Sequence, residues 1–139
     1  MNEKTWLGAI YLKEEGGYEI ILRALNHYKK RLQTINSSPE LSEAPMFVQV
    51  VQQEAMKNIP KIQNIIEQIS NSLDDANSLN ALQNDVSFME KSLNSYKTDL
   101  QKALSNTHQY YIKLIPEANS YKPDLELIDY ALQKITQFS

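Results

Sequence analysis

The stretch ANSLNALQNDVSFMEKSLNSYKTDLQKA, residues 76–103, decides the fold class. Its apolar residues recur at alternating intervals of three and four, the spacing of a helix that packs through a single narrow seam. Pro116 ends this pattern, which therefore predicts a long helix over residues 76–115. The seam consists of Leu79, Leu82, Val86, Met89, Leu93, Tyr96, Leu100 and Ala103.

Three more segments with helical periodicity lie outside this stretch and predict helices over residues 5–35, 45–73 and 123–138. Gly16-Gly17 interrupts the first segment, which is either one kinked helix or a short helix followed by a longer one. Pro60 lies inside the second segment and is expected to kink or break it. A kink is favoured because the apolar stripe keeps its phase across the proline.

A short turn, Asp74 to Asn77, joins the second and third segments and predicts that they pack as an antiparallel hairpin. Far from the turn both helices are apolar on several faces, at residues 46–51 and 110–115, so we expect that end to form the core. Either the first helix covers the whole hairpin, which we favour, or part of the hairpin projects. The sequence thus predicts a single all-α domain over residues 1–139, a helical bundle dominated by an antiparallel hairpin with a coiled-coil-like seam.

Composition narrows the classes of function. A net charge of −3 argues against a general nucleic-acid binder, which needs a basic surface to neutralise phosphates. The absence of cysteine excludes disulfides, thiolate nucleophiles and Cys-ligated metals. The N-terminal residues lack the features of a signal peptide, and the apolar run Trp6–Leu12 is too short to span a bilayer. We therefore expect a cytoplasmic protein without membrane insertion.

Only two histidines, His27 and His108, are available for catalysis or metal binding. Neither follows a glutamate by three residues, as a ferritin-like di-iron site requires. A haem held by Met46 and His108 is conceivable, although core packing already explains the methionine. The basic run Lys29-Lys30-Arg31 fits a helix C-terminus, where the macrodipole favours cations. The sequence thus identifies no catalytic, cofactor-binding or metal-binding residue, and no cofactor is expected.

The remaining positive signal for function is the seam itself. Charged residues beside an apolar seam are the pattern by which helices select their partners. The expected function is therefore that of a non-enzymatic interaction or assembly protein, which binds a protein partner or forms a homo-oligomer. The alternative is a bundle that binds a small ligand or haem. The charged residues expected to flank the seam are Asp85, Glu90, Lys97 and Asp99.

Overall fold

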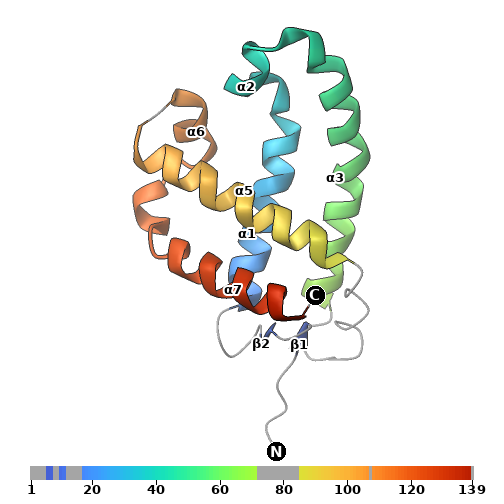
Figure 1. Cartoon of the computed structure of the whole chain (residues 1–139), viewed down its shortest axis with the longest axis vertical. Helices are drawn as coiled ribbons and strands as arrows, with labels where there is room; N and C mark the ends of the chain where they lie inside the picture. Colours follow the sequence, from blue (N-terminus) through green and yellow to red (C-terminus); the bar gives the residue numbers. More distant parts are fainter. Residues whose placement is uncertain (1–5, 8–9, 12–16, 72–84, 107, 139) are drawn as a thin grey trace, which may run out of the picture.

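The computed structural model describes residues 6–7, 10–11, 17–71, 85–106 and 108–138, and it confirms the predicted all-α helical bundle (Figure 1). Within the described ranges, the short 3-10 turns Ile35–Ser37, Pro45–Phe47 and Ala118–Tyr121 lie between helices. The helices are α1 (Gly17–Gln33), α2 (Pro39–Ser42), α3 (Val48–Asn71), α5 (Val86–Leu104), α6 (Gln109–Leu114) and α7 (Asp124–Phe138).

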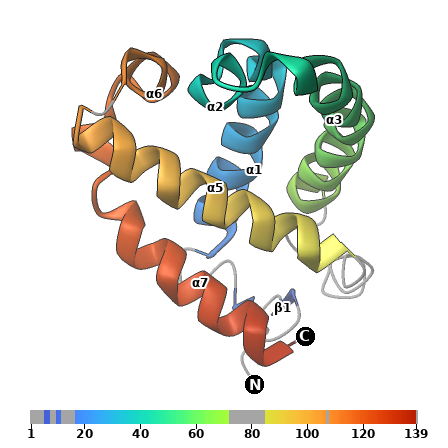
Figure 2. The same ribbon diagram turned by 45° about the horizontal axis from the view of Figure 1, so that its top comes forward.

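Helix α1 is the centre of the bundle. It makes its most extensive contacts with α3 and with α5, and it also contacts α7. Helices α5 and α7 lie side by side, run in opposite directions and cross α1, whereas α3 runs alongside α1 (Figures 1 and 2). The apolar side chains of α1 that are almost completely buried are Ile20, Ile21, Ala24 and Leu25.

The predicted antiparallel hairpin of the second and third helices is not the organising contact of this bundle. Helices α3 and α5 each pack mainly on α1 and make few contacts with each other. The physical reason is that α1 buries neighbouring positions such as Ile20 and Ile21, so its apolar face is wide enough for two partners. The predicted turn, Asp74 to Asn77, lies outside the described residues.

The positions predicted for the apolar seam of residues 76–103 are buried wherever their side chains are described. On α3 the predicted apolar stripe includes Ala55, Ile62, Ile66 and Ile69. These four side chains are buried, and so is Ile65, which the stripe did not include. The helix continues across Pro60, so the proline does not break it. The seam residues found buried are Met89, Leu93, Tyr96, Leu100 and Ala103.

Two predicted helix boundaries are wrong. The first helix begins only at Gly17; before it, Trp6–Leu7 (β1) pairs with Ile10–Tyr11 (β2) as short antiparallel strands. Aromatic and β-branched residues favour such extended pairing over helix.

The third helix ends at Leu104 instead of continuing to residue 115. Asn106 has a φ of 53°, the left-handed conformation that asparagine tolerates after a helix. His108 then caps α6, because its Nδ1 accepts a hydrogen bond from the backbone N–H of Tyr110 at 3.0 Å.

The expectation that both apolar ends would enter the core is only half correct. Tyr110, Tyr111 and Leu114 of α6 are buried. At the start of α3, however, Met46 and Val50 are 79% and 61% exposed. The cause is that α1 covers only the opposite face of α3, where Ala55 and Ile62 are buried.

We expect Leu100→Ala to lower the free energy of unfolding by about 2–5 kcal/mol, because it leaves a cavity where α5 packs on α1. Thr98→Ala, two residues away on an exposed position of the same helix, should change it by about 0.5 kcal/mol or less. Urea unfolding followed by circular dichroism measures both. Equal losses for the two variants would contradict the assignment of the buried face of α5.

Candidate functional site

A row of cationic and polar side chains follows one face of α1. Arg23, His27 and Arg31 are spaced four residues apart, which places them above one another on the same face of the helix. This face meets two carboxylates, Asp99 of α5 and Asp124 of α7, which are only 2% and 4% exposed. We call these five residues the ionic network.

Asp124 anchors one end of the ionic network. Its carboxylate accepts two hydrogen bonds from Arg23, at 2.8 Å from Nε and 2.7 Å from Nη2, a bidentate ion pair. It also accepts a hydrogen bond of 2.7 Å from the Tyr96 hydroxyl. Because Asp124 is the first residue of α7, these bonds fix the start of that helix against α1 and α5.

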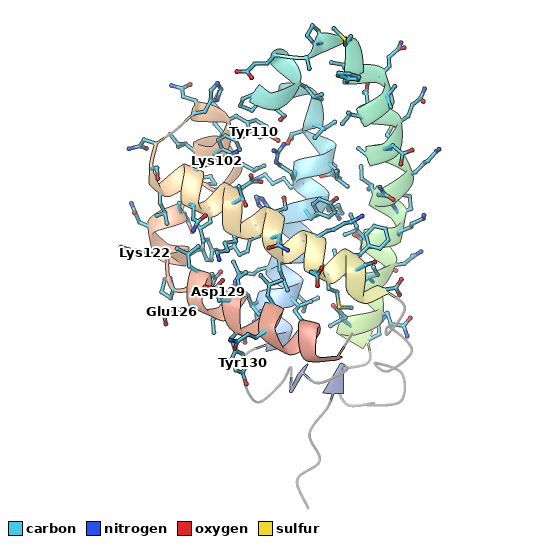
Figure 3. All side chains as sticks on the ribbon, in the orientation of Figure 1. Lys102, Tyr110, Lys122, Glu126, Asp129 and Tyr130 are labelled. Carbon is cyan, nitrogen blue, oxygen red and sulfur yellow. The ribbon has the colours of Figure 1, made fainter. Side chains whose placement is uncertain are left out.

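Asp99 anchors the other end. Its Oδ2 atom lies 2.8 Å from His27 Nε2 and accepts a hydrogen bond of 2.9 Å from Arg31 Nε. The Arg31 guanidinium also lies over the rings of Tyr110 and Tyr111, 5.2 and 5.8 Å from their centroids. Figure 3 labels Tyr110 on α6, so Arg31 connects α1, α5 and α6.

Burial and charge shift two proton equilibria within this region. Burial, together with the hydrogen bond to Asp124, raises the pKa of Tyr96 well above its ordinary value. The hydrogen bonds to Asp124 raise the pKa of Arg23. Tyr96 therefore stays a neutral donor, and Arg23 stays charged, across the physiological range.

One expectation about the charged flanks of the seam is wrong, and the ionic network itself was not predicted from the sequence. Asp99 was expected to be an exposed flank of the seam, but it is buried because Arg31 compensates its charge and His27 Nε2 lies within hydrogen-bond distance of its carboxylate. Lys97, in contrast, is a partly exposed flank as expected, and its Nζ lies 2.6 Å from Oδ1 of Asp129 on α7 (Figure 3). Asp85 and Glu90 are also partly exposed.

A cavity of about 370 Å³ lies beside the ionic network, between α1 and the segment that follows α6. Its wall includes the positions of α1 that face away from α3, and the Lys30 ammonium donates a hydrogen bond of 3.0 Å to the carbonyl oxygen of Leu114 there. Cationic, aromatic and apolar groups thus converge on one space. Side chains that line it include Arg23, His27, Lys30, Tyr96, Leu114 and Tyr121.

The conceivable haem ligands do not form a buried pair. Met46 is 79% exposed, and His108 is an exposed residue whose Nδ1 already accepts the capping hydrogen bond of α6. Among the described residues, no group of three or more His, Asp or Glu side chains is placed to hold a metal ion. In the same part of the chain, no helix combines the length and the apolar character needed to cross a membrane.

A second surface feature lies at the start of α3. Met46, Phe47, Val50 and Met56 are large apolar side chains that remain more than half exposed. We call these four residues the α3 patch. Met46 and Phe47 lie four and three residues before Val50, the spacing of neighbours on a helix surface, and exposed apolar patches mark interaction surfaces. The ionic network, the cavity and the α3 patch are the features from which a function can be argued.

We expect Asp99→Asn to lower the free energy of unfolding by about 3–5 kcal/mol, because Arg31 loses the buried charge that compensates it and His27 loses the carboxylate beside its Nε2. Asp129→Asn removes the acceptor of a partly exposed ion pair and should cost about 1 kcal/mol or less. Denaturant unfolding of both variants tests this. A loss for Asp99→Asn as small as that for Asp129→Asn would show that the buried pair does not stabilise the fold.

The raised pKa of Tyr96 predicts a loss of stability in alkali. In the unfolded chain Tyr96 releases its proton near pH 10, whereas in the folded chain it keeps the proton to a higher pH. The stabilisation is therefore complete below about pH 10 and falls as pH rises above it. Unfolding from pH 8 to 11 should show a steeper decline for the natural protein than for Tyr96→Phe. Parallel declines would contradict the assignment to Tyr96.

Comparisons with known proteins add no family to this description. The chain matches no protein-family model, no curated protein and no solved structure. Function is therefore argued from the surfaces and the site alone.

Proposed function

We propose that this protein is a non-enzymatic assembly protein that associates with a second copy of itself through the α3 patch. The observation that carries this proposal is the exposure of Met46, Phe47, Val50 and Met56. Their combined apolar surface would gain free energy on removal from water, at about 25 cal/mol per Å².

The inner face of α3 is already occupied. Ala55, Ile62 and Ile69 are buried, and α3 packs on α1. A helix cannot turn its outer side chains inward without exposing the inner ones, because both faces belong to one rigid backbone. Val50 and Met56 can therefore be covered only by something outside the described fold.

The charge pattern favours a second copy as the occupant. Residues 44–53 carry no charged side chain, and the glutamates Glu43 and Glu54 stand at either end of this stretch. In a two-fold symmetric contact the same surface faces itself, so like charges at its centre would repel. An uncharged centre rich in Met, Val and Gln avoids that repulsion, which supports self-association. A different protein bound at this face is the outcome that the test below separates.

The test compares two exposed positions of α3. Val50→Asp places a charge in the α3 patch, and Ser70→Asp places the same charge near the other end of the helix. Light scattering coupled to size exclusion, from about 1 µM to about 1 mM, covers weak and strong interfaces. We expect the natural protein and Ser70→Asp to approach the mass of two chains, and Val50→Asp to keep the mass of one.

Two results would refute self-association through the α3 patch. One is a natural protein with the mass of a single chain at the highest concentration, which would leave a different protein as the only occupant. The other is a dimer that Val50→Asp leaves intact, because the interface would then lie elsewhere. Circular dichroism of both variants controls for folding, since substitutions at exposed positions should change stability by about 0.5 kcal/mol or less.

A further inference from the structure

The cavity beside the ionic network has the size of a small-molecule site. Its volume of about 370 Å³ lies in the range of pockets that hold small organic ligands. Leu114, Ile115 and Pro116 supply an apolar wall, and Tyr121 supplies an aromatic one. Such walls accept an apolar group and leave recognition to the few polar atoms among them.

His27 provides the first of these polar atoms. The residue is only 7% exposed, and its Nε2 is engaged with Asp99. Its Nδ1 makes no hydrogen bond to the described residues, yet no fully buried side-chain nitrogen or oxygen among them lacks a partner. Solvent can therefore reach Nδ1. It does so from the cavity, because His27 lines the cavity wall. Nδ1 is thus a polar atom in the cavity wall that a bound ligand can contact.

Hydrogen-bond donors line the same cavity. Arg23 uses Nε and Nη2 for Asp124, so its Nη1 stays available. The Lys30 ammonium gives one N–H to the carbonyl oxygen of Leu114 and has two more to donate. Lys30 makes no ion pair with another described residue. The guanidinium of Arg23 and the ammonium of Lys30 can therefore both donate hydrogen bonds to the carboxylate of a ligand.

An anionic acceptor completes the set. Glu117 lines the cavity, and within the described part of the chain its carboxylate has no ion-pair partner. Lys30 and Glu117 are both exposed, so water solvates their charges in the absence of a ligand. A ligand with a single charge would pair with only one of these two residues. A zwitterion with an apolar group pairs with both and places its apolar group on the apolar wall.

We propose that this cavity binds a free amino acid with an apolar or aromatic side chain. The carboxylate of the ligand binds Lys30 and Arg23, its ammonium group donates to Glu117, and its side chain lies against Leu114, Ile115 and Tyr121. Binding here does not depend on the α3 patch, none of whose residues lines the cavity.

The experiment titrates the ¹⁵N-labelled full chain with L-phenylalanine and follows backbone amide shifts by NMR. Two matched probes each lack one charge: 3-phenylpropanoate has no ammonium group, and phenethylamine has no carboxylate. We expect saturable shifts at Leu114, Ile115 and Glu117 with L-phenylalanine, with a dissociation constant of about 0.1–1 mM for a ligand of this size. Each probe should bind about tenfold more weakly or worse, because one charge-assisted contact is lost.

Neighbouring lysines provide the matched variants. Lys30→Met should weaken binding of L-phenylalanine about tenfold, the effect of one lost charged contact. Lys29→Met should change it less than about twofold, because the Lys29 Nζ donates to Gln63 on α3 and does not line the cavity. Glu117→Gln should weaken L-phenylalanine but leave 3-phenylpropanoate unchanged. Val50→Asp should bind like the natural protein, which separates this site from the α3 patch.

Three results would overturn the amino-acid site. The first is the absence of saturable shifts at the cavity up to about 20 mM ligand, far above the expected dissociation constant. The second is 3-phenylpropanoate or phenethylamine binding as tightly as L-phenylalanine. The third is equal weakening by Lys29→Met and Lys30→Met, which would reduce the effect to the overall charge of the protein.

Discussion

The arrangement of this bundle depends on the compensation of two buried carboxylates. Asp99 and Asp124 come from different helices, α5 and α7, and neither carboxylate can stay ionised inside the protein without partners. Helix α1 supplies those partners from one face, through Arg23, His27 and Arg31. Sliding α1 by one turn relative to α5 would mismatch these pairs, so the ionic network sets the register that apolar packing alone leaves loose.

Placing α1 at the centre has consequences on both sides of it. Helix α3 packs its inner face on α1 and is left with an apolar outer face at Met46 and Val50. Beyond the ionic network, Pro116 follows the end of α6, and the segment that continues to Tyr121 lines the cavity together with Lys30 of α1. One helix therefore determines where both the α3 patch and the cavity lie. The two proposed activities, self-association and amino-acid binding, use different faces of the same scaffold.

The spacing of apolar residues along the chain predicted the helices well, but it predicted poorly which helices pack on each other. The seam at Leu93 and Leu100 and the fourth helix follow directly from apolar spacing. The helix that packs on that seam could not be predicted in the same way, because the spacing of apolar residues identifies the buried face of a helix but not the element that covers it.

Asp99 shows the same limit for the site. The four-residue spacing of Arg23, His27 and Arg31 was visible, but Asp99, the partner of His27 and Arg31, is 72 residues from His27 in the chain. The Ser-Asn-Thr-His run at residues 105–108 was the readable signal for the end of α5.

The most direct test of the central claim, that α3 uses its outer face to bind a second copy, is hydrogen–deuterium exchange measured at increasing protein concentration. Self-association through the α3 patch predicts that amide exchange slows with concentration in peptides covering residues 44–56, while peptides from α5 and α7 stay unchanged. Exchange that is independent of concentration throughout the chain would contradict the claim. So would protection that rises only in α7 or in another segment away from α3.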